Sequence, residues 1–122
     1  MARLGPDEFR KRLKKALDIG SNTYSPDDIA RAVSEGRMQA WENRDSLIVT
    51  EILQYPQFCA MNVIVAVGDL RDVMEMQQRV EEFAREHSCK FIRIEGRKGW
   101  DRVLPRYGAQ NTNRVIYERA LA

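Results

Sequence analysis

The sequence predicts one α/β domain with a mixed sheet flanked by helices, and three observations support this class. An almost wholly apolar, β-branched run, Ala60–Val67, is typical of a central strand buried on both faces. A long amphipathic stretch from Leu70 to His87 predicts a helix after it. A short apolar run, Phe91–Ile94, follows that helix. Because strand, long crossover and strand form a βαβ unit, we expect these two strands to be parallel, with a right-handed crossover.

Two helices are expected before the sheet. The first spans residues 6–18, where apolar residues recur at helical spacing. These residues are Phe9, Leu13, Ala16 and Leu17. The second helix follows Ser25, which can cap it, because Pro26 suits the first helical position and Asp28 stands where a capping-box acid would. Gly36 is the expected end of this helix.

Two further strands are expected ahead of the central one. A short strand, Met38–Trp41, is followed by a hairpin turn over residues 42–45 and a second strand, Leu47–Leu53. Apolar residues occupy both faces of that second strand, so we expect it to be covered on both sides. Residues 55–57 break the run. Tyr55–Phe58 is the best candidate for an exposed apolar loop, with folding back onto the sheet as the alternative.

The last third of the chain is expected to hold a turn, a short helix and a final strand. The turn spans residues 96–99, and a short helix or helical turn follows from Trp100 to Tyr107, with its regularity limited by Pro105. Gly108 is a candidate left-handed cap for that helix. Val115–Leu121 has apolar residues on both faces and is expected to be the last strand.

Length and composition indicate a single domain over residues 1–122, with a basic helix in 1–22 and the core in 23–122. The chain is 43% hydrophobic and 31% charged, which is typical of a globular protein. Its longest apolar run, eight residues, is too short to cross a bilayer, and no apolar leader opens the sequence. Cys59 and Cys89 lack metal-ligand spacing and are expected to be small buried residues in a reducing compartment, the cytosol. No metal site is expected.

The first helix carries most of the local positive charge, although the net charge of the chain is only +2. Its cations are Arg10, Lys11, Arg12, Lys14 and Lys15. Such a helix could bind nucleic acid, a membrane surface or an acidic protein. It has no Trp to anchor in lipid and no interleaved aromatics to stack on bases. We therefore expect a docking helix with a solvated cationic face, and an acidic protein partner ahead of nucleic acid.

The order of elements resembles the GNAT superfamily of acyl-CoA-dependent N-acyltransferases over Ser25–Leu121. Three segments carry the resemblance: the buried strand AMNVIVAV feeding a helix, the strand KFIRI after it, and the tail YGAQNTNRVIYERAL. The segment EGRKGWDRVLPRYGA also resembles small GNAT-like proteins of tailed bacteriophages. The resemblance implies a GNAT-like sheet and acetyl-CoA as cofactor. It also implies that the backbone at Val65 and Val67 would hold pantetheine.

The sequence departs from the family where the chemistry lies. The family places an Arg or Gln, two residues, and then Gly-x-Gly or Gly-x-Ala before the long helix, so that backbone N–H groups reach a pyrophosphate. Here residues 68–72 read Gly-Asp-Leu-Arg-Asp, and the carboxylates would repel that group. The family's usual general acid is a Tyr four residues before the Gly of the short helix. Leu104 occupies that position here, and Tyr107 lies closer to the Gly. Glu51 could serve as a base, but a solvated or paired strand Glu is favoured. His87, the single histidine, is expected at a core boundary. We assign no catalytic residue.

These observations lead us to expect a non-catalytic GNAT-like protein that acts through protein contacts. The phage resemblance implies a virion or assembly component, in the host cytoplasm or the particle, with phage structural proteins as partners and an oligomer as one form. The alternatives are an N-acetyltransferase with a divergent phosphate loop and a nucleic-acid-binding accessory domain. The predicted partner site is the turn after the last parallel strand, where Arg97 and Lys98 offer charge and Trp100 supports them.

Overall fold

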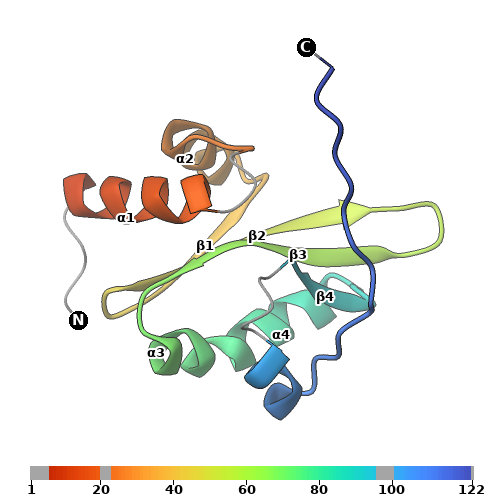
Figure 1. Cartoon of the computed structure of the whole chain (residues 1–122). Coiled ribbons are helices and arrows are strands. Elements are labelled where there is room, and N and C mark those ends of the chain that lie inside the picture. The colour runs from red at the N-terminus through yellow and green to blue at the C-terminus, as the bar shows by residue number, and fades with distance from the viewer. Residues whose placement is uncertain (1–5, 20–22, 96–100, 122) are drawn as a thin grey trace.

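A four-stranded mixed sheet lies between two layers of helices. The computed structural model describes residues 6–19, 23–95 and 101–121 (Figure 1). The elements are α1 (Pro6–Ile19), α2 (Pro26–Ser34), β1 (Gln39–Asn43), β2 (Ser46–Gln54), β3 (Cys59–Val67), α3 (Leu70–Glu75), α4 (Gln77–Glu86), β4 (Phe91–Ile94) and the 3₁₀ turn η2 (Leu104–Tyr107). Helices α1 and α2 cover one face of the sheet and α3 and α4 the other (Figure 1). The predicted α/β class is therefore confirmed.

The sheet has the order β1-β2-β3-β4. Strand β2 pairs antiparallel with β1 and with β3, whereas β3 pairs parallel with β4. The expected βαβ unit is thus present, with α3 and α4 as its crossover. Only Ala60–Val63 of β3 pairs with β4, so that β3 continues past the end of its parallel neighbour.

The sequence signals at the start of α2 and at the hairpin correspond to real contacts. Ser25 Oγ accepts from the backbone N–H of Asp28 at 3.2 Å, and the backbone N–H of Ser25 donates to Asp28 at 2.9 Å. These hydrogen bonds lower the pKa of Asp28. The hairpin turn consists of Arg44 and Asp45, with Arg44 in the left-handed region at φ 55°. Gly36, just beyond the end of α2, has φ 78°.

Two apolar clusters fill the spaces between the sheet and the helix layers. The cluster under α1 and α2 contains Leu13, Leu17, Ile29, Ala32, Met38, Leu47, Val49 and Val65. The cluster under α3 and α4 contains Ile48, Met61, Val73, Met76, Val80 and Ala84. Leu13 and Leu17 come from the basic helix, so the predicted docking of its apolar stripe is confirmed.

The short helix or helical turn expected after Trp100 is present as the 3₁₀ turn η2, which ends at Gly108 with φ 86°. Two other sequence-based expectations about helices and strands are wrong. The single helix over residues 70–87 is divided at Met76, whose N–H donates to the carbonyl oxygen of Val73 and whose side chain is buried among core residues. The last strand, Val115–Leu121, is absent, because this segment pairs with none of the four strands and its apolar side chains are exposed.

Both cysteines are free thiols near the amino end of β3. Cys59 is buried and donates to the carbonyl oxygens of His87 and Ser88 at 3.4 and 3.3 Å. Cys89 is half-buried. Burial, followed by its hydrogen bond and charge interaction with Cys59, raises the pKa of Cys89 from its usual 9.0 to about 11.

This shift predicts slow alkylation of Cys89 near neutral pH, because the thiolate is the nucleophile. The rate of iodoacetamide labelling, followed by mass spectrometry, should rise only as the pH approaches 11. Since the folded chain holds the proton more tightly, this thiol should also make stability fall with rising pH between 9.0 and about 11. The denatured chain is the control. Equal labelling of folded and denatured Cys89 at about pH 8, below the usual pKa of a thiol, would contradict the prediction.

No helix among the described residues is both long enough and apolar enough to cross a bilayer.

Candidate functional site

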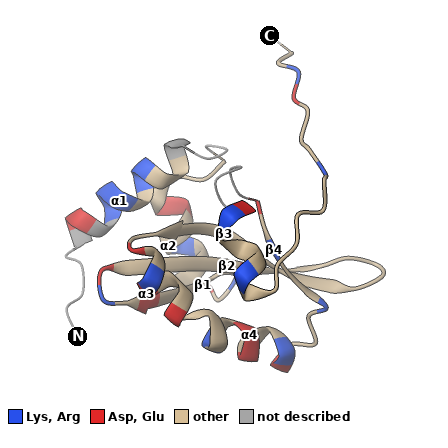
Figure 2. Cartoon of the chain, turned by 60° about the horizontal axis from the view of Figure 1, so that its bottom comes forward, with Lys and Arg blue, Asp and Glu red and all other residues tan. Residues whose placement is uncertain are grey.

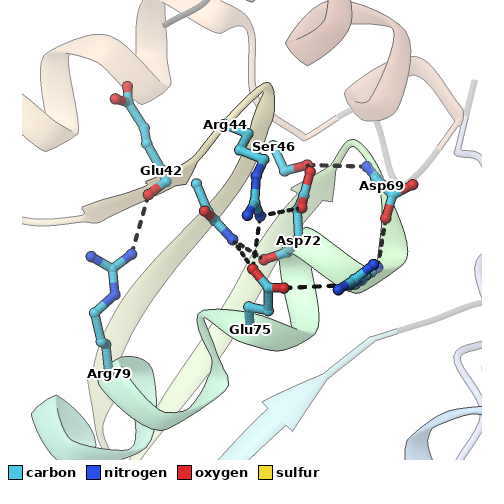
Figure 3. Close-up of polar contacts among 9 residues, drawn as sticks. Glu42, Arg44, Ser46, Asp69, Asp72, Glu75 and Arg79 are labelled. Atoms are coloured by element: carbon cyan, nitrogen blue, oxygen red, sulfur yellow. Dashed lines mark hydrogen bonds and ion pairs between the residues drawn. The ribbon is translucent and has the colours of Figure 1, made fainter. Parts of the chain in front are cut away.

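The segment after β3, where the sequence departs from the acyltransferase pattern, uses its backbone donors internally (Figure 3). The N–H of Asp69 donates to Ser46 Oγ at 3.0 Å, and the N–H of Arg71 donates to Asp69 Oδ1 at 2.8 Å. Ser46 Oγ in turn donates to Asp72 at 3.4 Å. Gly68, with φ 116°, lies directly against Ser46. The start of α3 is therefore closed by the chain's own serine and carboxylates.

Further polar contacts fasten the β1–β2 hairpin to α3 (Figure 3). Arg44 reaches both Asp72 and Glu75 at 2.8 Å. Asn43 donates to the backbone carbonyl of Asp72 at 2.9 Å and to Glu75 at 3.1 Å. Hydrogen bonds from Arg44 and then Asn43 lower the pKa of Glu75. Each charge in this network has a partner within the chain, which indicates a structural role.

A cluster of three rings and two cations lies at the other end of the sheet. Phe58 packs against Tyr55 and Phe91, with ring centroids 5.5 and 5.4 Å apart. The Arg93 guanidinium lies 5.5, 5.2 and 6.0 Å from the centroids of Tyr55, Phe58 and Phe91. Lys90 Nζ lies 5.8 Å from Phe58 and 5.5 Å from Phe91. We call these five residues the aromatic–cationic cluster.

The aromatic–cationic cluster is open to solvent and has unneutralised charge. Phe91, on the edge strand β4, is 46% exposed, and Lys90 is also exposed. Neither Lys90 nor Arg93 forms an ion pair with a described carboxylate. Arg44, by contrast, has two carboxylate partners. The cluster thus presents apolar surface and positive charge together, a combination that suits an acidic segment with apolar or aromatic side chains.

A polar row crosses the sheet beside the cluster. Asn62 of β3 lies in register with Glu51 of β2 and Arg93 of β4. The Oδ1 of Asn62 is buried and has no hydrogen-bond partner among the described residues. Such an acceptor costs free energy until it receives a donor. A donor from a bound segment would therefore be favoured here.

Glu51 also lines an open pocket of about 460 Å³ together with Arg37 and His87. Burial, followed by the negative charge of Glu51, raises the pKa of Tyr24. No group of three or more His, Cys, Asp or Glu side chains that could hold a metal occurs among the described residues.

Of the residues predicted from sequence as sites, the structure describes Val65 and Val67, which lie outside the aromatic–cationic cluster. Val65 and Val67 pack in or against the apolar core under α1. Arg97, Lys98 and Trp100 lie outside the described residues. They follow the carboxyl end of β4, whereas the cluster gathers at its amino end, where Phe91 pairs with Ala60. For Tyr55–Phe58 the sequence left two readings open, an exposed apolar loop and a segment folded back onto the sheet. In the structure Tyr55 and Phe58 are half-buried, and Phe58 packs against Phe91 of β4.

Comparisons with known proteins find structural likeness only. No family model matches the chain, and no curated protein matches it. A point mutant of TTHA1254 from Thermus thermophilus has a TM-score of 0.65 at 14% identity, over 97% of this chain and 95% of that one. A transcriptional regulator from Bacillus halodurans C-125 has a TM-score of 0.64 at 12% identity, over 98% and 97%. The tetramutant of BH1408 protein from Bacillus halodurans gives 0.60 at 13% identity, over 92% and 86%.

These neighbours correct the resemblance drawn from the sequence. They are a Thermus protein and transcriptional-regulator-like proteins rather than GNAT acetyltransferases, so the assignment to the GNAT superfamily and its phage members is wrong. The resemblance rested on the order of elements, including a final strand over residues 115–121 that does not form. At 12–14% identity the likeness shows the fold alone, a small mixed sheet with helices.

Proposed function

We propose that this chain is a binding domain whose aromatic–cationic cluster holds an acidic segment of a partner protein. The observation that carries the proposal is the pairing of the exposed Phe91 ring and two half-buried rings with two cations that lack carboxylate partners among the described residues. A carboxylate of the partner would interact with the positive charges of Lys90 and Arg93, and an aromatic or apolar side chain next to it would cover Phe91. The unpaired Oδ1 of Asn62, in register with Arg93, adds an acceptor for a partner's donor.

The contacts at the start of α3 favour binding over acyl transfer from acetyl-CoA. Two backbone N–H groups there already donate to Ser46 and Asp69. The carboxylates of Asp69, Asp72 and Glu75 would oppose a pyrophosphate. A virion or assembly protein with an exposed acidic segment, met in the host cytoplasm or the particle, would belong to the proposed class of partner.

The basic helix supplies a weaker case for nucleic acid, the ligand class suggested by a neighbour described as a transcriptional regulator. Lys and Arg recur along α1 (Figure 2). However, Arg10 pairs with Asp27 of α2 at 2.6 Å, and Arg12 pairs with Glu8 at 3.2 Å. The first pair joins α1 to α2 and the second lies within α1, and both neutralise part of the charge of the helix, so we give priority to the aromatic–cationic cluster.

Selection from a library of random displayed peptides tests the proposal. Peptides that bind the immobilised chain should be enriched in Asp or Glu next to an aromatic residue. Reversing both cluster charges, Lys90→Glu with Arg93→Glu, should weaken a selected peptide roughly 30-fold, the equivalent of about 2 kcal/mol. The readout is the Kd of a fluorescent peptide. The melting temperature of the double variant checks that it folds, because Lys90 is exposed whereas Arg93 is half-buried against three rings.

The matched control reverses two exposed cations of α1, Lys11→Glu with Lys15→Glu, and should leave the Kd unchanged. Peptides without carboxylates, or equal binding by both double variants, would contradict the proposal. A rise in melting temperature with excess acetyl-CoA would support the enzyme instead, since saturation at about 100 times Kd adds about 2.7 kcal/mol. Binding of duplex DNA with a steep salt dependence, lost in the α1 variant, would favour the nucleic-acid alternative.

A further inference from the structure

The C-terminal segment has the composition of a β-strand but pairs with none of the described strands. Val115, Ile116 and Tyr117 are β-branched or aromatic, the residue types enriched in strands. Their exposed fractions are 67%, 68% and 91%, and that of Leu121 is 92%. Among the described residues, no backbone hydrogen bond joins residues 110–121 to another part of the chain. Figures 1 and 2 both show this segment leading away from the sheet.

Strand β4 has an edge with which such a segment could pair. It is an edge strand, paired on one side with β3 and with no described strand on its other side. Its ends carry exposed apolar side chains, Phe91 and Ile94. An edge of this kind offers unpaired N–H and C=O groups as a template for another strand. Within the described residues, each copy of the chain therefore carries both a strand-like segment and a strand edge that lack a partner strand.

We infer that residues 114–118 of one copy pair antiparallel with β4 of a second copy, with Tyr117 beside Phe91. This inference names one partner for the proposed binding site and rests on it, because Lys90 and Phe91 belong to both. Two copies can exchange their segments reciprocally, which closes a symmetric dimer.

The side chains select this register. With Tyr117 opposite Phe91, Glu118 lies opposite Lys90, a cation that has no described carboxylate partner. Ile116 then lies opposite Ile92, whose side chain packs on the apolar cluster under α4. A shift by one residue would turn Ile116 away from that apolar cluster to the opposite face of the sheet. Apolar and charged side chains thus agree on one arrangement.

Mass measurement by light scattering and sedimentation equilibrium tests the inference on the full chain. We expect the full chain to form a dimer that dissociates on dilution. A chain that ends at Asn113 should be a monomer, with the same melting temperature as the dissociated full chain. Ile116→Asp should also give a monomer. Thr112→Asp is the matched control, since it adds the same charge outside the pairing residues and should leave the dimer intact.

Charge exchange tests the register. Glu118→Lys or Lys90→Glu alone should weaken dimerisation about tenfold, because each changes two symmetric contacts. The two substitutions combined in one chain should restore it. A full chain that stays monomeric at all concentrations, a dimer that survives removal of residues 114–122, or a combined variant no better than the single ones would overturn the inference.

The failure of this inference and that of the proposed function can be told apart. The chain ending at Asn113 keeps all five residues of the aromatic–cationic cluster. If it binds acidic peptides while the full chain is monomeric, the inference fails and the proposed function stands. If the full chain dimerises through its C-terminal segment but no acidic peptide binds the shortened chain, the proposed function fails and the inference stands.

Discussion

Gly68→Ala should be among the most damaging single substitutions in this chain, lowering stability by about 4 kcal/mol or more. Gly68 has φ 116°, which side chains rarely tolerate, and its added Cβ would lie 2.7 Å from the Cα of Ser46. Because one obstructing atom is backbone, β2 and the start of α3 would have to separate. Thermal and urea denaturation, followed by circular dichroism, measure the loss.

Two other glycines with positive φ provide matched controls. Gly36 and Gly108 have φ 78° and 86°, but nothing lies within 4 Å of the position of an added Cβ. Their replacement by Ala should cost only the backbone strain, about 1–2 kcal/mol. Adding Ser46→Gly to Gly68→Ala should rescue only part of the loss, since the Cα of residue 46 remains. If all three Ala variants melt alike, the close approach of β2 to this turn is not important for stability.

Leu13→Ala should lower stability by about 2–5 kcal/mol, the usual range for removing a buried leucine side chain. Leu13 is 1% exposed and packs with residues of α2 and the sheet, including Ile29 and Val49. The melting temperature should fall by roughly 10 °C or more in a domain of this size. The expected loss follows from the position of α1, whose apolar stripe forms part of the core.

Lys15→Ala on the same helix is the control and should change stability by no more than about 0.5 kcal/mol, because this side chain is exposed. Calorimetry on both variants separates burial from helix propensity, since each replaces a good helix former with Ala. Should Leu13→Ala prove as harmless as Lys15→Ala, α1 would be an appendage of the domain and not a part of its core.

The parts of the fold that could be predicted from the sequence are those set by local patterns. The capping residues Ser25 and Asp28 marked the start of α2, and the apolar run Ala60–Val67 marked the central strand. The helix break at Met76 could not be found this way, because apolar spacing continues across it. Met76 is buried in the core at this break, with φ −80° and ψ −12°. The absent last strand shows the same limit, since strand composition at Val115–Leu121 indicates a tendency without supplying a neighbour.

The aromatic–cationic cluster was only partly predictable because it depends on register. Tyr55 and Phe58 were expected as an exposed loop, and β4 was expected beside β3. The sequence does not reveal that Ala60 pairs with Phe91, which is what brings Phe91 and Arg93 beside that loop. The carboxyl ends of parallel strands usually bind ligands, and this rule favoured the opposite end of β4. Exposure and the lack of carboxylate partners became visible only in three dimensions.

The parallel pairing of β3 with β4 also has a consequence for the order of folding. Strands β1, β2 and β3 are joined by short turns, so their contacts are close in sequence and can form early. Strand β4 is expected to dock later, because its contacts with β3 close a loop of about 30 residues. The aromatic–cationic cluster takes Phe91 and Arg93 from this late element. A newly made chain would therefore acquire its proposed binding surface at the end of folding, so an incompletely folded copy would not yet be able to capture a partner.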